Sequence, residues 1–153
     1  MTTIANDQQL RALLESLSGD DQRRLGLGFV ESVIHLCQDD RVKRAIATGL
    51  RDDASPDALE DAYRAAKAWA TKTYTDCGKE TDWLAQADHF VAAATAAALT
   101  PDELITEKVN RAWKAAMQAR MANNCELVEA EDSSAEGEIE RQYQIASKFA
   151  AGR

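Results

Sequence analysis

Glu31, His35 and Asp39 are the residues whose types and spacing come closest to a metal site in this chain. Residues four apart share one face of a helix, so a helix here would align a carboxylate with the imidazole and place a second carboxylate at the helix end. Such oxygen and nitrogen atoms are suitable ligands for a divalent metal. Di-iron bundles, however, need a Glu-x-x-His pair on each of two helices, and the sequence contains no such pair. The competing interpretation is a histidine stabilised at a helix end by nearby carboxylates and by the helix dipole.

The remaining candidates for catalysis lack the partners that nucleophilic or acid–base chemistry needs. His89 follows Asp88 in an alanine-rich segment, where a single histidine is typical of a hydrogen-bonding core or interface residue. Cys37 is only two residues from His35, and side chains two apart do not face each other on a helix, so a Cys–His dyad is not expected. Phosphate-binding glycine loops, a nucleophile elbow and the His-Glu-x-x-His motif are also missing. The sequence therefore predicts a protein that is not an enzyme and that uses no cofactor.

The charge of the chain favours a basic protein as its partner. The formal net charge of the 153 residues is −8, so no positive field would attract phosphates and nucleic-acid binding is not expected. The acidic residues that follow one another without a Lys or Arg between them near the end of the chain are Glu126, Glu129, Glu131, Asp132, Glu136, Glu138 and Glu140. We expect Glu129, Glu131 and Asp132 to contact the partner, whereas a solvated loop before a helix start is the alternative.

A small basic surface is expected around Trp113. It would consist of Lys108, Arg111, Lys114 and Arg120. In an acidic protein this surface would meet the acidic end of the same chain or of a second copy. The sequence therefore leaves a homodimer open.

The elements that must position these residues are helices, and two prolines mark where two of them begin. Thr100 and Pro101 are followed by a capping-box glutamate, which predicts a long helix over about residues 101–122. Ser55 and Pro56 repeat the pattern, with a hydroxyl that can accept an unpaired backbone N–H, and predict a helix that reaches Tyr74. Apolar residues recur every three to four positions along this second segment, as an amphipathic helix requires.

Further helices are predicted by the same periodicity and by capping residues. They cover residues 7–17, 18–36, 40–50, 82–99 and 134–150. Segments 56–74 and 82–99 should be antiparallel neighbours with a break at Cys77 and Gly78. Gly26 and Gly28 indicate either close packing against another backbone or a frayed helix start. No segment alternates as a strand does. The predicted fold class is therefore all-α: a single-domain bundle, residues 1–153, of six to seven helices with an alanine-rich core, in which residues 123–133 form a polar acidic linker before the C-terminal helix.

The sequence is typical of a cytoplasmic protein. The first residues show no signal-peptide pattern, and no apolar run is long enough to span a bilayer, so no membrane association is expected. Cys37, Cys77 and Cys125 are an odd number of cysteines at wide spacing, which argues against a disulfide framework. We expect free, partly buried thiols.

One part of the chain resembles a known family. Residues 25–36, the Asp-Asp-Arg-Val-Lys-Arg-Ala-Ile element that starts at Asp39, residues 65–70 and the alanine-rich segment around His89 are similar to the bacterial Imm-5-like immunity proteins, over roughly residues 25–119. The resemblance implies a small helical protein that neutralises a toxin by binding it, with Asp40, Arg41 and Arg44 at matched positions. It implies no catalytic residue.

The sequence thus predicts a non-enzymatic helical protein that binds another protein, of the immunity or antitoxin type, with a basic toxin as partner. Two alternatives stay open. One is a metal-binding or enzymatic bundle centred on Glu31 and His35, and the other is a structural protein.

Overall fold

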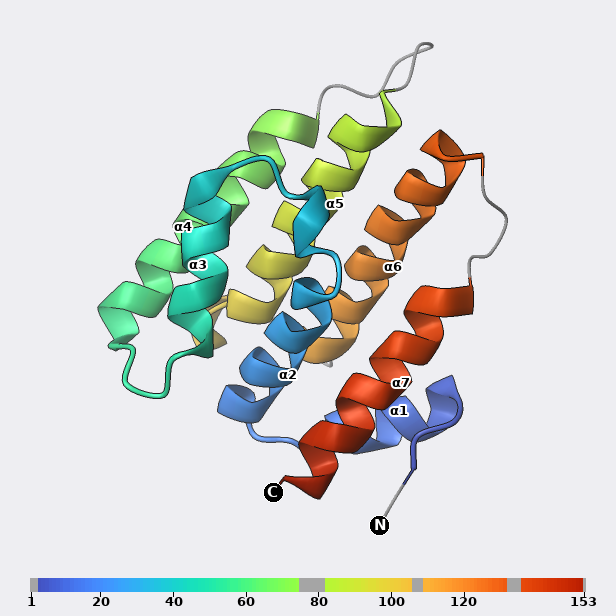
Figure 1. Ribbon diagram of the computed structural model, residues 1–153. Helices are drawn as coiled ribbons and strands as arrows, with labels where there is room; N and C mark the ends of the chain where they lie inside the picture. Colours follow the sequence, from blue (N-terminus) through green and yellow to red (C-terminus); the bar gives the residue numbers. More distant parts are fainter. Residues whose placement is uncertain (1–2, 75–81, 106–108, 132–135, 153) are drawn as a thin grey trace.

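The chain folds into a single bundle of α-helices (Figure 1). The computed structural model describes residues 3–74, 82–105, 109–131 and 136–152. These residues form seven α-helices, two short 3-10 helices and no strand, which confirms the predicted all-α class and the number of helices. None of the described helices combines the length and the apolar composition needed to cross a membrane.

Successive helices alternate in direction from the second to the last (Figure 1). In chain order the elements are α1 (Asp7–Glu15), α2 (Gly19–Glu31), η1 (Ile34–Leu36), α3 (Asp40–Leu50), α4 (Pro56–Thr73), α5 (Trp83–Leu99), η3 (Asp102–Leu104), α6 (Arg111–Glu129) and α7 (Glu136–Ala151). As predicted, α4 and α5 are antiparallel neighbours, so the start of α4 lies at the same end of the bundle as the end of α5. The expected break at Cys77 and Gly78 lies outside the described residues.

Side-chain caps fix most of the helix starts at the predicted residues. Ser55 accepts from the N–H of Ala58 at 3.1 Å, and Asp39 accepts from the N–H of Arg41 at 2.8 Å. Ser18 and Asp82 cap α2 and α5 in the same way. Each cap pairs a backbone N–H that the first helical turn would otherwise leave without an acceptor.

Helix α5 forms the centre of the bundle and packs against α2, α3, α4 and α6. It is buried on nearly all sides, and six of its buried residues are alanines, which confirms the alanine-rich core. A Cβ atom on Gly26 of α2 would lie 3.1 Å from the Cβ of Ala98 and 3.3 Å from the Cα of Ala112. The predicted close packing is therefore confirmed at Gly26, where a larger residue would push its neighbours apart, but not at Gly28, where a Cβ would meet only Ile145 at 3.4 Å.

The predicted helix over residues 101–122 is wrong at its start. Thr100 ends α5 instead, since its hydroxyl donates to the carbonyl of Ala96 at 2.8 Å. Pro101 has an extended backbone, with φ −64° and ψ 152°, and only the 3-10 turn η3 follows it. The long helix α6 begins at Arg111, where the side chain of Asn110 accepts from the N–H of Trp113 at 3.0 Å.

Two further boundaries differ from the sequence-based expectation. Residues 123–129 belong to α6 rather than to a linker, and both Asn123 and Cys125 of this segment are buried. The chain turns at Glu131, which has a positive φ of 55°. Helix α2 ends at Glu31, so Leu36 reaches the core from η1. Cys37 and Cys125 are buried thiols that form no disulfide among the described residues, and Cys77 lies outside those residues.

Helix α7 is fastened by buried polar side chains. Glu138, only 1% exposed, accepts from the hydroxyl of Ser32 at 2.6 Å and from Arg141 at 2.8 Å. Gln142 donates to the carbonyl of Ala116 at 2.9 Å, and its own oxygen accepts from Arg120. A buried polar group costs free energy unless it is hydrogen-bonded, so these bonds favour a single position of α7 against the rest of the bundle.

Candidate functional site

The structure does not bring Glu31, His35 and Asp39 together as metal ligands. His35 lies in η1 and its Nε2 is 2.9 Å from Oε2 of Glu126. Asp39 caps α3 and pairs with Arg41 at 3.1 Å. Among the residues that the structure describes, no group of three or more His, Cys, Asp or Glu side chains has an arrangement that could hold a metal ion. The chain's own geometry therefore favours the interpretation of His35 as a helix-end residue stabilised by a carboxylate.

The residues predicted to bind a partner lie at one end of the bundle. Asp40, Arg41 and Arg44 are exposed at the start of α3, and Glu129 and Glu131 are exposed at the end of α6. Both of these helix ends are at the top of the view in Figure 1. Arg41 is engaged by Asp39 and lies over the ring of Trp69, with 5.8 Å between Cζ and the ring centroid. Asp132 lies outside the described residues.

The basic surface expected around Trp113 is largely turned inward. Arg111 is buried, and Arg120 reaches inward to Asp7 and Gln142. Lys114 is exposed, and Lys108 lies outside the described residues. The described residues therefore do not form the continuous basic patch that was expected to support self-association.

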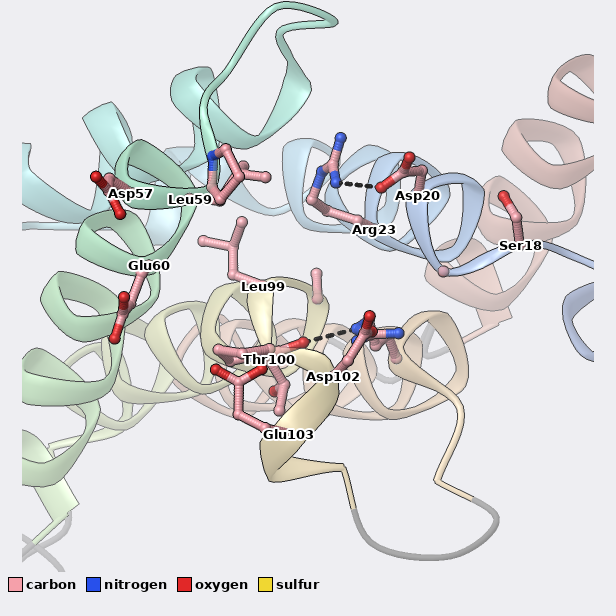
Figure 2. Close-up of a pocket in the computed structure, with 15 residues that line it drawn as sticks. Ser18, Asp20, Arg23, Asp57, Leu59, Glu60, Leu99, Thr100, Asp102 and Glu103 are labelled. Atoms are coloured by element: carbon pink, nitrogen blue, oxygen red, sulfur yellow. Dashed lines mark hydrogen bonds and ion pairs between the residues drawn. The ribbon is translucent and has the colours of Figure 1, made fainter.

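A cleft with a volume of about 460 Å³ opens at the opposite end of the bundle (Figure 2). The starts of α2 and α4, the end of α5 and the turn η3 surround it. Five carboxylates and two arginines of the described residues line it, and these seven side chains have a formal net charge of −3. The carboxylates are Asp20, Asp57, Glu60, Asp102 and Glu103, and the arginines are Arg23 and Arg111. We refer to this feature as the acidic cleft.

Both arginines of the acidic cleft are held by the protein itself. Arg111 donates from Nε to the carbonyl of Thr100 at 2.7 Å and pairs through Nη2 with Asp102. Arg23 donates from Nε to the carbonyl of Gly49 at 3.1 Å and from Nη1 to Asp20 at 2.8 Å. Their positive charges are thus used to tie the helix ends together, and little of either guanidinium is exposed.

The negative charges of Asp57, Glu60 and Glu103 are less fully neutralised by ion pairs. Asp57 and Glu103 form no ion pair with any residue that the structure describes, and Glu60 pairs only with Arg64, at 2.8 Å on the exposed side of α4. In Figure 2 Asp57 and Glu60 lie on the α4 side of the cleft, and Asp20 and Asp102 lie on the opposite side. A cationic group at the cleft would therefore have carboxylates from both sides nearby.

The sequence contained an indication of this site that the helix predictions obscured. The two Ser/Thr-Pro motifs, at residues 55–56 and 100–101, contribute Pro56, Thr100 and Pro101 to the lining of the acidic cleft. Considered one motif at a time, the acidic residues that follow are explained by helix capping alone. Because α4 and α5 are antiparallel, the residues that start α4 and those that follow α5 must meet at one end of the bundle. The predicted pairing of these helices, carried one step further, would have brought the acidic residues together.

Comparison with known proteins gives no match. A scan against protein-family models, a search of curated proteins and a search of solved structures each found nothing that matches this chain. The similarity to the Imm-5-like immunity proteins therefore stays a prediction from the sequence. A function has to be inferred from the geometry and the charges of the chain itself.

Proposed function

We propose that this chain is a non-enzymatic, cytoplasmic protein-binding bundle that holds a basic segment of a partner protein in the acidic cleft. One observation carries the proposal. The two arginines of the cleft form hydrogen bonds and ion pairs within the protein, whereas Asp57 and Glu103 form no ion pair with a described residue. The opening of the cleft therefore has an excess of negative charge. The family resemblance implies a toxin as the partner, and a toxin with a basic surface fits this requirement.

The cleft suits the insertion of a long cationic side chain. Its volume of about 460 Å³ lies within the range of ordinary binding pockets, roughly 300–1,000 Å³. A guanidinium is planar and can donate to carboxylates in pairs, and such charge-assisted bonds are about twice as strong as neutral ones. Arginine is therefore the residue type that the site would favour in its partner.

The frame of the cleft is held in place before any partner arrives. Arg111 is 8% exposed and joins the carbonyl that ends α5 to the turn η3. Arg23 joins the start of α2 to the end of α3 through Gly49. A preformed site loses less conformational freedom on binding than a flexible one. These internal bonds therefore support recognition without contacting the partner.

The test compares two double variants that remove the same charge. Asp57→Asn with Glu103→Gln neutralises the cleft, and Asp40→Asn with Glu129→Gln neutralises the other end of the bundle. The control is matched because Asp57 and Asp40 both lie in the first turn of a helix. The probe is an arginine-rich peptide, titrated by calorimetry, with circular dichroism to check that each variant is folded.

We expect the cleft variant to weaken peptide binding about tenfold, and the control to change it by less than about twofold. Equal weakening by both variants would mean that net charge alone attracts the peptide. Greater weakening by the control would place binding at the ends of α3 and α6. Either result would refute the acidic cleft as the binding site.

A further inference from the structure

A second groove, with the opposite charge, lies between α4, α5 and α6. Its volume is about 540 Å³, and alanines of α5 such as Ala93, Ala96 and Ala97 line it. Tyr63 and Tyr74 contribute aromatic rings from α4 and its C-terminal end. We call it the His89 groove, because His89 is the one lining side chain that is both titratable and buried among those that the structure describes. Its apolar lining with few polar groups is typical of a small-molecule site.

Among the residues that the structure describes, the full charges that line the His89 groove are positive. They are Lys67 of α4 and Lys114 of α6, and none of the described lining residues is a carboxylate. Neither lysine forms an ion pair with a residue in the described part of the chain, and both are exposed. The protein has a net charge of −8, so two lysines without an ion pair to a described residue, on the two helices that flank α5, make this region locally positive. This site would therefore attract an anion.

The contacts of the Thr73 hydroxyl favour one tautomer of His89. Nδ1 lies 2.9 Å from the hydroxyl oxygen of Thr73, and that hydroxyl donates to the carbonyl of Trp69 at 2.8 Å. A hydroxyl has one proton, so Thr73 accepts from Nδ1–H, and Nε2 of the neutral ring remains as an acceptor. Edge-on contacts with Tyr74 and Phe90, at 5.8 and 5.2 Å between ring centroids, hold the ring in place.

Burial keeps this imidazole neutral near neutral pH. Loss of solvent lowers the pKa of His89, and the carbonyl of Ala70 and the carboxylate of Asp88 oppose only part of that effect. A neutral ring does not repel the two ammonium groups and offers a lone pair to a donor. The groove thus combines an anion-attracting rim, an apolar wall and one acceptor.

We propose that the His89 groove binds a small aromatic hydroxycarboxylate. Its carboxylate lies between Lys67 and Lys114, its ring lies on the alanine wall, and its hydroxyl donates to Nε2 of His89. A peptide or a second copy of the chain fits less well, because a specific protein interface buries about 800 Å² per partner and this chain repels its own copies by charge. The proposal is independent of the acidic cleft.

Three related probes separate the contributions of the two ligand groups. Hydroxynaphthoate carries the carboxylate and the hydroxyl, naphthoate lacks the hydroxyl, and naphthol lacks the carboxylate. With calorimetry on the full chain we expect one saturable site for hydroxynaphthoate, and about tenfold weaker binding of naphthol. Naphthoate should bind about threefold to tenfold more weakly than hydroxynaphthoate.

Matched variants assign the site. The double variant Lys67→Ala with Lys114→Ala should weaken the binding of hydroxynaphthoate about tenfold. The control, Lys43→Ala with Lys148→Ala, removes the same charge from exposed positions elsewhere and should change the affinity little. His89→Phe keeps a ring but removes the acceptor, so it should abolish the preference for hydroxynaphthoate over naphthoate. The probe comparison on the unchanged protein stands even if this variant does not fold.

Several outcomes would overturn the proposal. They are no saturable binding of hydroxynaphthoate, equal affinity for naphthol, or equal weakening by both lysine pairs. Displacement of the ligand by an oligoglutamate peptide of equal or higher affinity would assign the groove to an acidic protein segment instead. A dimer in sedimentation analysis that only Lys67→Ala with Lys114→Ala dissociates would assign it to a second copy of the chain.

Discussion

The indole nitrogen of Trp69 lies 2.8 Å from Oδ2 of Asp88, so α4 donates to a carboxylate of α5 that is only 4% exposed. The other carboxylate oxygen accepts from the backbone N–H of Gln38 at 2.7 Å. One buried acid thus ties two helices to the segment between η1 and α3. A buried carboxylate is tolerated only when its oxygens are paired, and both are paired here.

Asp88→Ala should lower the free energy of unfolding by about 1–3 kcal/mol, because it leaves the indole N–H of Trp69 without an acceptor in the core. Urea denaturation, followed by tryptophan fluorescence, measures this loss. Asp88→Asn keeps one acceptor oxygen and should cost less. A loss for Asp88→Ala below about 0.5 kcal/mol, as at an ordinary surface position, would show that the bond does not stabilise the fold.

Two glycines of α2 should respond in opposite ways to alanine. At Gly26 the new Cβ would meet the backbone of Ala112 at 3.3 Å and Ala98 at 3.1 Å, and we expect a loss of about 1–3 kcal/mol from overpacking. At Gly28 the new Cβ would meet only Ile145, at an ordinary 3.4 Å, and the better helix propensity of alanine should stabilise the protein by up to about 1 kcal/mol. Thermal denaturation of the two variants checks the contrast. Equal effects would contradict the close approach at Gly26.

Asp7 should contribute to stability at neutral pH and lose that contribution in acid. A hydrogen bond from Arg120 lowers its pKa, burial partly opposes the shift, and a bond from Tyr143 lowers the pKa further. Because the folded pKa is below the ordinary 3.8, the stabilisation is present above 3.8 and disappears as the pH falls through the folded value. In the Asp7→Asn variant the free energy of unfolding should therefore decrease less steeply at acidic pH than it does in the wild type. An unchanged acid limb in this variant would show that the ion pair is not linked to folding.

Protonation of His89 should destabilise the fold in the mildly acidic range. Burial lowers its folded pKa below the ordinary 6.5, so the unfolded chain takes up a proton first as the pH falls. Stability is thus complete above 6.5 and decreases as the pH falls from 6.5 towards the folded value. Urea midpoints for the wild type and His89→Phe, compared from about pH 7.5 down to about pH 5.5, test this. An equal slope in both proteins would assign the effect to other groups.

Local interactions explain which parts of the fold could be predicted from the sequence. Asp39 and Ser55 cap helices by bonds to residues two or three positions away, so residue type and spacing were sufficient. Thr100 has the same pattern, but its hydroxyl turns back to Ala96 and its carbonyl is taken by Arg111. The bond from Arg111 depends on the tertiary arrangement, and the capping motif alone could not reveal it.

In the candidate sites, too, the interactions between residues distant in the sequence could not be predicted. The pairing of His35 with Glu126 joins residues 91 positions apart, and no local spacing predicts it. The expected linker was inferred from its polarity, yet Asn123 is buried and lies within hydrogen-bonding distance of Arg141 of α7. Polar composition indicates a loop only when the neighbouring helix offers no polar partner. The acidic cleft likewise arises from segments that the antiparallel pairing of α4 and α5 brings together.

The methyl groups that fill the middle of this bundle also determine how it responds to temperature. An alanine has no rotamers to freeze and hides little surface, so each one adds little to the entropy lost, or to the heat capacity gained, between folded and unfolded chain. A helix such as α5, with six buried alanines, should therefore give a heat-capacity increment below the usual range of about 12–15 cal/mol/K per residue. The stability curve would then be broad, and cooling would weaken this protein less than it weakens one built on leucine and phenylalanine.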